Sequence, residues 1–293
     1  MVSIKRLFLL LLCCLLGANG LAQKQDSIDK QKLRKLIIGE SVAYAAGMTV
    51  LGTIWYGEEA SRTFTFFNDN QQWNQLDKAG HVFTAYHLSA VNARLLSRAG
   101  IPKRKAYFLS GITSTAMMLP IEIFDGFSPT YGASWSDAVS NAIGAFMPFQ
   151  ELLWDQQYIH LKYSFSQTSY AAKRPEILGN NLSEQWLKDY NGQTYWVSTN
   201  FNVFSKSNIF PRFLMFSFGY GADEMLYGSP DQNNKNGFQS YRQLYFSLDF
   251  DFSEINTNNK WLKALFYALN LVKVPLPALE INKNGLRFHP IYF

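Results

Sequence analysis

The sequence has very little cysteine. Its two cysteines, Cys13 and Cys14, both lie in the first 14 residues. If the chain before Gln23 is removed on export, no cysteine remains, which excludes a disulfide, a thiolate nucleophile and a cysteine metal ligand. An exported protein without disulfides must take its stability from its core, its sheet or a membrane.

Charge is scarce as well. Charged residues make up 17% of the chain, against about 25% in an average soluble protein. The formal net charge is only +5, and it is spread without the basic clusters of a nucleic-acid site, so we expect no nucleic-acid partner. Aromatic residues, in contrast, reach 16% of the chain, with 24 Phe and 16 Tyr. This surplus favours a membrane interface or a β-rich region.

The familiar catalytic motifs are also missing. The sequence has no G-x-S-x-G nucleophile elbow and no H-E-x-x-H zinc helix. It has no Walker or Rossmann glycine loop, which argues against a nucleotide site. His87, His160 and His289 lack the Arg-rich or Ser-Gly context of a lipid phosphatase. We interpret His87 as structural.

The N-terminus has the three parts of an export signal. A positively charged start precedes the apolar run Leu7–Leu16, and the small residues Gly20 and Ala22 follow it. Such a run is too short to span a bilayer comfortably. We therefore predict that residues 1–22 are a signal peptide and that the mature chain begins at Gln23.

The alternative is a lipoprotein signal, in which Cys13 or Cys14 carries the lipid. A lipobox has a small residue directly before its cysteine, whereas Leu12 is bulky. Cleavage there would also fall inside the apolar run. Plain cleavage fits the sequence better than lipidation.

Residues 23–156 have a helical pattern. The candidate helices are Leu36–Tyr56, Leu76–Ala99, Lys103–Phe124 and a fourth that Ser134 or Ser136 caps and that runs towards Trp154. Pro120 should kink or end the third helix. Two apolar parts, Leu36–Tyr56 and Ala106–Ile123, have nearly the length of a membrane span. Their Ser, Thr, Gly and carboxylate residues fit a compact bundle equally well, so both alternatives stay open.

Residues 157–293 change to a period of two, which indicates strands. The alternation is found in Tyr158–Ser166, Tyr195–Phe204, Arg212–Tyr220 and Tyr241–Glu254, and a final strand leads to Phe293. An amphipathic helix is expected near residues 260–272. The smallest closed membrane barrels need about eight strands, and about five are visible here. We therefore predict an α+β protein: a bundle of about four helices, then an open antiparallel sheet.

The polar face of these strands has two interpretations. In a soluble sheet it is the wet face, and Asp249 and Asp251 are then solvated carboxylates rather than a cation site. In a membrane wall the apolar face lies against lipid instead.

Polar residues recur at helical spacing in the first half. Asp77 and His81 are four residues apart, Glu122 and Asp125 three, and Asp137 and Asn141 four, so each pair shares a helix face. If the helices pack antiparallel, the pairs meet at one end of the bundle.

A group of this kind suits two chemistries. A divalent metal would be held by His81, Asp77, Glu122 and Asp125. General acid–base catalysis would use His81, Asp77, Glu122 and Asp137, with Asn141 in the surrounding polar network. The structural alternative is that Asp77 and Asp137 stabilise helix starts and that His81 only ties helices together.

The same residues form a recognisable order. The strings are Asp77-Lys78-x-x-His81, Glu122-x-x-Asp125-Gly126 and Ser134-Trp135-Ser136-Asp137-x-x-x-Asn141-x-x-Gly144. This order resembles the YfiM-like family of predicted periplasmic lipoproteins, a domain of unknown function, over about Asn74 to Trp154. It is more loosely similar to VanZ-like membrane proteins, which have Gln where Asp125 stands here.

The second half also resembles longer members of the YfiM-like family. The similar segments are Asp189-Tyr190-Asn191-Gly192-Gln193-Thr194-Tyr195-Trp196, Phe218-Gly219-Tyr220-Gly221 and Phe288-His289-Pro290-Ile291-Tyr292-Phe293. The resemblance implies an envelope location and brings no established reaction.

These observations predict an exported protein of the outer membrane or periplasm. We expect a membrane-associated structural or binding module, with membrane lipid or outer-membrane components as partners, as a monomer or an oligomer. The alternative is an enzyme that acts on an envelope lipid or glycan through the His/carboxylate site, with a divalent metal as the expected cofactor.

Overall fold

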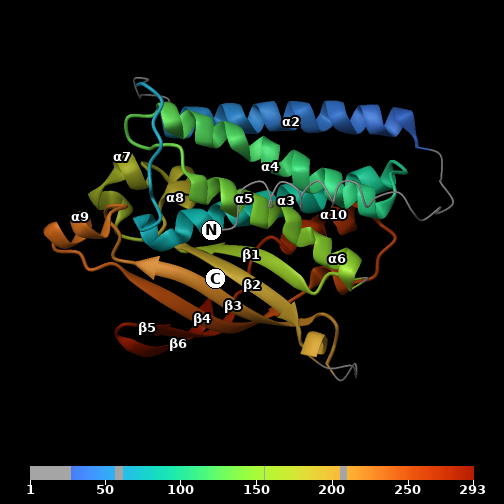
Figure 1. Cartoon of the computed structure of the whole chain (residues 1–293). Helices are drawn as coiled ribbons and strands as arrows, with labels where there is room; N and C mark the ends of the chain where they lie inside the picture. The colour runs from blue at the N-terminus through green and yellow to red at the C-terminus, as the bar shows by residue number, and fades with distance from the viewer. Residues whose placement is uncertain (1–27, 57–61, 155, 205–209) are drawn as a thin grey trace, which may run out of the picture.

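The computed structural model describes residues 28–56, 62–154, 156–204 and 210–293 (Figure 1). The predicted signal peptide and its cleavage site before Gln23 lie outside the described residues. The chain is α+β, as predicted, with helices in the first half and a six-stranded antiparallel sheet in the second.

Among the described residues, four long helices make up the helical half. They are α2 (Lys30–Tyr56), α3 (Leu76–Arg98), α4 (Lys103–Phe127) and α5 (Trp135–Phe146). Figure 1 shows them in layers, with α2 outermost, α4 beneath it, and α3 next to the sheet. Shorter helical pieces are η1 (Gln72–Gln75), η2 (Met147–Phe149), α6 (Gln150–Leu153), η3 (Ala171–Lys173), α7 (Pro175–Leu178), α8 (Leu182–Lys188), η4 (Phe201–Phe204), α9 (Pro230–Lys235), η5 (Phe252–Glu254) and α10 (Lys260–Leu269).

Two prolines change the predicted helix ends. Of the two outcomes expected at Pro120, a kink or an end, the end does not occur, because α4 continues through Pro120 to Phe127. Pro120 has no backbone N–H to donate to the preceding turn. Its helix is held there by packing, because Ile121 contacts the cluster of Ala85, Met118 and Ala145. The fourth helix does not run unbroken towards Trp154. It stops at Phe146, and Pro148 lies in the 3₁₀ turn that follows.

The sheet is a meander in which each strand pairs with the next. Its strands are β1 (Ile159–Phe165), β2 (Gln193–Asn200), β3 (Leu214–Asp223), β4 (Tyr241–Phe250), β5 (Leu276–Asn282) and β6 (Gly285–Tyr292). The prediction of about five strands missed β5, which contains Pro277 and follows Pro275. Pro277 is tolerated because the register with β6 shifts between Leu276 and Ala278.

The sheet curls until its first and last strands approach each other. Tyr163 of β1 exchanges backbone hydrogen bonds with Leu271 and Lys273, at 2.9 and 3.0 Å. Ser166, just after β1, donates a hydrogen bond to the carbonyl oxygen of Phe293 at 3.1 Å. The concave face is therefore enclosed by the sheet itself.

The enclosed face is the polar one. Lys162 and Asp249 are both 0% exposed and pair at 3.1 Å, and Asp251 pairs with His160 at 3.2 Å. The expectation that Asp249 and Asp251 are solvated is therefore wrong. A period of two shows that a strand has two different faces, and the curl of the whole sheet decides which face is enclosed.

Helix α3 joins the two halves. The ring of Phe83 packs against Tyr163 and Tyr195 of the sheet. His87 donates a hydrogen bond from Nε2 to the carbonyl oxygen of Leu161 at 2.9 Å. The α3 end that carries Asp77 and His81 is thereby held against strands β1 to β3.

Candidate functional site

The site begins with a strained turn before α3. Trp73, Asn74 and Gln75 have φ values of 49°, 47° and 64°, a left-handed conformation that costs roughly 1–2 kcal/mol per residue. The turn is held from the sheet side, where Tyr220 donates to the carbonyl oxygen of Asn74 and Arg242 to Gln75 Oε1. Consecutive strained residues of this kind cluster at functional sites.

Three helices and this loop bring the predicted polar residues together. Asp77, Lys78 and His81 come from α3, Glu122 from α4, and Asp137 and Asn141 from α5. Close contact between α3 and α5 depends on Gly144, because a Cβ there would lie 2.2 Å from the carbonyl oxygen of Val82. We call Asp69, Asp77, Lys78, His81, Glu122, Asp137 and Asn141 the polar cluster.

Lys78 is the centre of one part of the cluster. Its Nζ lies 2.5 Å from Asp69, 2.8 Å from Asp77 and 2.8 Å from Asp137. One ammonium group thus contacts three carboxylates from a loop and two helices.

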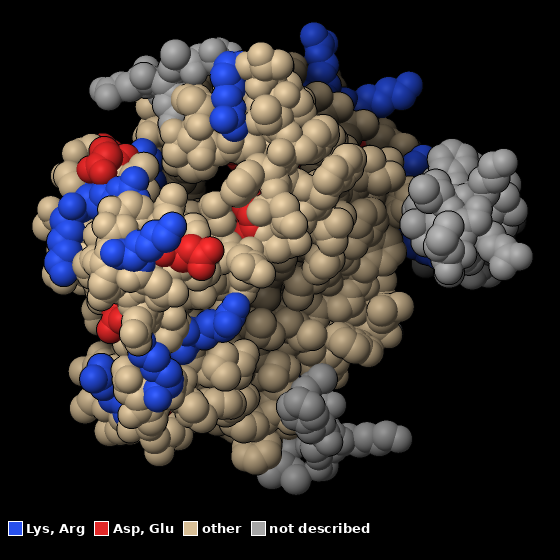
Figure 2. All heavy atoms as spheres, turned by 60° about the vertical axis from the view of Figure 1, so that its left-hand side comes forward, with Lys and Arg blue, Asp and Glu red and all other residues tan. Residues whose placement is uncertain are grey.

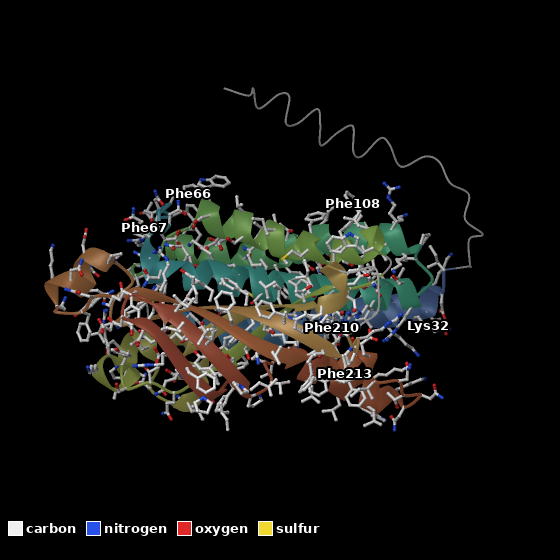
Figure 3. All side chains as sticks on the ribbon, turned by 90° about the horizontal axis from the view of Figure 1, so that it is seen from below. Lys32, Phe66, Phe67, Phe108, Phe210 and Phe213 are labelled. Atoms are coloured by element: carbon white, nitrogen blue, oxygen red, sulfur yellow. The ribbon has the colours of Figure 1, made fainter. Side chains whose placement is uncertain are left out.

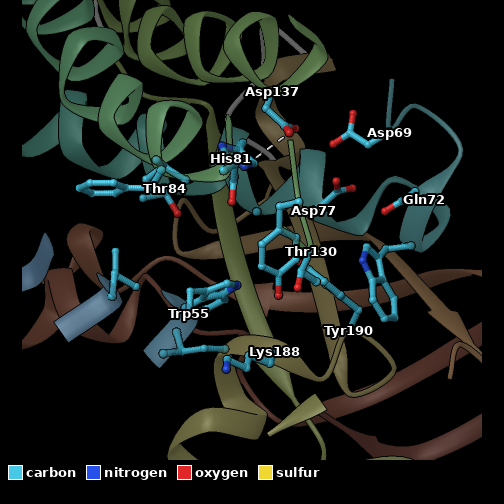
Figure 4. Close-up of a pocket in the computed structure, with 18 of the residues that line it drawn as sticks. Trp55, Asp69, Gln72, Asp77, His81, Thr84, Thr130, Asp137, Lys188 and Tyr190 are labelled. Atoms are coloured by element: carbon cyan, nitrogen blue, oxygen red, sulfur yellow. Dashed lines mark ion pairs between the residues drawn. The ribbon is translucent and has the colours of Figure 1, made fainter. Parts of the chain in front are cut away.

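His81 is the centre of the other part (Figure 4). Its Nδ1 lies 2.9 Å from Asn141 Oδ1 and 3.8 Å from Glu122 Oε1. Its Nε2 lies 3.9 Å from Asp137 Oδ1. Only the first of these distances is that of a hydrogen bond.

Ser134, one of the two serines predicted as a cap, caps α5. Its Oγ accepts a hydrogen bond from the Asp137 amide at 3.2 Å and donates one to Asp69 at 2.7 Å. The Ser134 amide donates to Glu122 Oε2 at 3.1 Å. Because Ser134 performs the capping, the side chain of Asp137 is available to the polar cluster.

Burial dominates the electrostatics. It raises the pKa of Asp77 to about 6, although Lys78 acts in the opposite direction. Burial also raises the pKa of Asp137, against the attraction of His81 and Lys78. The pKa of Asp69 is lowered instead, because hydrogen bonds from Lys78 and Ser134 outweigh its burial. Neighbouring carboxylates raise the pKa of Lys78 in spite of its burial.

A pocket of about 260 Å³ opens over the cluster. Its polar lining includes Asp69, Asp77, His81, Asp125 and Asp137. Its apolar lining includes Met48, Leu51 and Trp55 of α2 and Met118 and Ile121 of α4. Figure 2 shows a hollow in the surface with acidic atoms visible inside it. The pocket therefore has a charged floor and an apolar side.

The structure groups the candidate metal ligands differently from the predicted set of His81, Asp77, Glu122 and Asp125. His81, Glu122 and Asp137 offer ligand atoms within 4.8 Å of one another, and Asp69, Asp77 and Asp137 form a second such group. Asp125 lines the pocket but is in neither group. Sequence reasoning missed Asp69 and the role of Lys78. The spacing from Lys78 to His81 is a usable signal, whereas Asp69 lies in a loop without periodicity.

Residues 65–152 match the model of a family described as predicted periplasmic lipoprotein (DUF2279). The match includes every residue of the polar cluster. It confirms the resemblance to periplasmic lipoproteins of unknown function and places the protein in the cell envelope, exported to the periplasm or outer membrane. No curated protein and no solved structure matches the chain.

Proposed function

We propose that this envelope protein is a binding module embedded in outer-membrane lipid through its sheet. The observation that carries the proposal is the inverted polarity of the strands. Lys162 and Asp249 are enclosed, while Phe218 and Leu248 on the outer face are 36% and 46% exposed. Apolar side chains that face outward around a polar interior are typical of a wall in contact with lipid.

The outer face forms continuous apolar rows. One row crosses five strands in register, through Val197, Phe218, Phe246, Leu279 and Phe288. The last strand continues it with Leu286 and Ile291, each 68% exposed. We call these seven residues the apolar belt. A soluble sheet would cover such rows with another layer.

Amphipathic helix α10 supports membrane contact. Its exposed apolar residues Trp261, Leu265 and Leu269 are spaced by four and form one stripe. Trp261 is 85% exposed. A short helix with an exposed apolar stripe and a tryptophan at its start is typical of a membrane interface.

Two helices are long and apolar enough to cross a membrane, by length and composition. They are Lys30–Trp55 in α2 and Lys103–Phe127 in α4. Basic residues stand at the start of each. Figure 3 shows Lys32, Phe210 and Phe213 at one end of the molecule and Phe66 and Phe67 at the other. The helices and strands run between these two ends.

Lipid explains the exposed surface better than a second protein copy does. The apolar belt lies on the sheet, whereas Ile37, Ile38 and Val42 of α2 are exposed on the opposite side of the helical layer. A two-fold partner would cover one of these surfaces and leave the other in water. A bilayer covers both.

Fractionation tests the proposal. We expect the exported protein in the outer-membrane fraction of a density gradient, resistant to carbonate. Phe218→Lys with Leu248→Lys should release it, because two lysines on the apolar outer face of the sheet would face lipid at a cost of about 2–4 kcal/mol each. Asn234→Lys, on exposed α9, is the control and should stay in the membrane. Recovery of the parent only in the soluble periplasm would refute the proposal.

The second candidate function is an enzyme that acts on an envelope lipid or glycan. It is favoured by the convergence of His81, Asp77 and Asp137 around an open pocket, rather than in an enclosed and fully paired network. The apolar wall and charged floor fit an amphipathic substrate. His81→Gln should then leave the melting temperature unchanged or raise it, whereas a purely structural histidine should give a large loss of stability.

A further inference from the structure

We propose that His81, Glu122 and Asp137 bind a divalent transition-metal ion such as zinc at the floor of the pocket. One nitrogen of His81 and one oxygen each of Glu122 and Asp137 lie within 4.8 Å of one another. Two atoms that bind one ion at about 2.1 Å lie about 3–4 Å apart. The site does not depend on the membrane proposal.

The first argument is charge. Four carboxylates, Asp69, Asp77, Glu122 and Asp137, meet in the polar cluster, and Lys78 is its one permanently charged cation. Lys78 contacts Asp69, Asp77 and Asp137. Glu122 lies instead beside His81. Partly buried carboxylates in such excess require a further positive charge or a proton.

The second argument is an unpartnered oxygen. Glu122 is only 7% exposed, and its Oε1 has no hydrogen-bond partner among the described residues. This oxygen lies 3.8 Å from His81 Nδ1, the nitrogen that hydrogen-bonds to Asn141, and this distance is too long for a hydrogen bond. Its other oxygen is held by the Ser134 amide, which orients Oε1 towards the histidine. An unpaired buried carboxylate oxygen of this kind costs free energy unless an ion or a water occupies the gap.

The third argument is the orientation of the imidazole. Asn141 Oδ1 lies 2.9 Å from His81 Nδ1, and an amide oxygen can only accept a hydrogen bond. Nδ1 therefore donates its proton to Asn141, and Nε2 lies 3.9 Å from Asp137 Oδ1. In the neutral imidazole with this tautomer, Nε2 carries the lone pair that a metal ion binds. Metal-binding histidines are held in this way by a second residue that accepts from the other ring nitrogen.

The donor set indicates the class of ion. An imidazole with two carboxylates suits zinc and related first-row metals better than calcium, which prefers oxygen ligands alone. Three protein ligands leave a further position for water or a bound group from the pocket. Lys78 contacts the same Asp137 oxygen at 2.8 Å, and on metal binding it can keep its contacts with Asp69 and Asp77.

The test is a metal titration of the full-length exported protein in detergent, after dialysis against a chelator. We expect one Zn²⁺ per chain by isothermal titration calorimetry, and a melting temperature that Zn²⁺ raises. Glu122→Gln and His81→Gln should weaken binding at least tenfold and lose the thermal shift. Asp125→Asn is the matched control, because this pocket carboxylate is outside the ligand set, and it should bind like the parent.

Cobalt provides a measurement that does not depend on the variants. Co²⁺ bound to the parent through a histidine nitrogen should show visible d–d absorption, which Zn²⁺ displaces. Absence of saturable binding by the parent would overturn the proposal, and so would a Glu122→Gln protein that binds as tightly as the parent. Either result would leave the polar cluster as a structural network. Neither result bears on membrane fractionation, so the two proposals fail separately.

Discussion

At the scale of single residues, the enclosed pair of Lys162 and Asp249 has the largest expected effect on stability. Asp249 also accepts hydrogen bonds from Ser198 and the Val274 amide. Lys162→Met removes the ammonium group that pairs with this carboxylate and leaves the buried Lys273 as its other nearby cation, at a cost of up to roughly 3–5 kcal/mol. Denaturant titration of the refolded protein measures the loss.

The double variant Lys162→Met with Asp249→Leu is the control for this prediction. Removal of both charges should recover most of the stability, because an apolar pair of similar volume replaces the ion pair. A loss below about 1 kcal/mol for Lys162→Met alone would show that the pair is not enclosed, since exposed ion pairs contribute that little.

A second residue-scale prediction concerns pH. Burial lowers the pKa of His87 to about 4, with Arg94 and His160 as the nearby cations. Between its unfolded value near 6.5 and about 4, the unfolded chain binds a proton that the folded chain does not. Stability should therefore fall as the pH drops through this window, by a total on the order of 3 kcal/mol.

His87→Gln removes this titration and serves as the comparison. Its free energy of unfolding should change less between pH 7 and pH 4.5 than that of the parent, although it is lower at pH 7 where the hydrogen bond to Leu161 is altered. Parallel pH profiles for the two proteins would contradict the prediction.

At the scale of helices and strands, the sequence predicts features that depend on neighbouring residues, such as helix caps. It does not predict how the sheet curls. Ser134 or Ser136 was predicted as the cap of α5, and Ser134 is the cap, because capping depends only on residues within one helical turn. Strand β5 was missed because Pro275 and Pro277 disfavour a strand assignment. The register shift that accommodates Pro277 depends on the pairing with β6 and is not visible in the sequence of β5. Which strand face is enclosed depends on the whole sheet.

The sequence predicts only some residues of the polar cluster. Helical spacing placed Asp77 and His81 on one face, since a period of 3.6 needs no tertiary information. Asp69 could not be found, because it reaches Lys78 only through a loop that ends in three left-handed residues. Asp137 rather than Asp125 lies beside His81, and this depends on how closely α5 packs on α3.

Gly144 sets that packing, which gives an element-scale prediction. Gly144→Ala places a Cβ against the Val82 carbonyl and should force α5 away from α3, at a cost of about 1–3 kcal/mol. The separation of Asp137 and Asn141 from His81 should then increase, and Zn²⁺ binding should weaken. Melting temperature and metal titration measure the two effects.

Gly47→Ala is the control, because nothing lies within 4 Å of a Cβ at this position in α2. The added methyl group should stabilise the helix by up to about 1 kcal/mol and leave Zn²⁺ binding unchanged. If Gly144→Ala behaves like Gly47→Ala, the close contact of α3 and α5 is not what holds the polar cluster together.

At the scale of the whole molecule, membrane attachment has two possible sources. The family match describes a lipoprotein, in which an acyl group on a cysteine holds the protein to the membrane. The structure offers a second source in the apolar belt and the exposed stripe of α10. The two sources predict different mature proteins, because acylation requires that Cys13 or Cys14 survives processing.

We predict that the mature chain begins at Gln23 and carries no lipid. If the sheet is embedded in lipid as proposed, the apolar belt across five strands holds the protein in the membrane without an acyl group. Intact-mass measurement of the exported protein should give the unmodified chain from Gln23. Replacement of Cys13 and Cys14 by serine should change neither this mass nor the fraction that resists carbonate. A mass increment of an acyl group, or release of the serine variant into the soluble periplasm, would show that the lipid anchor provides the attachment.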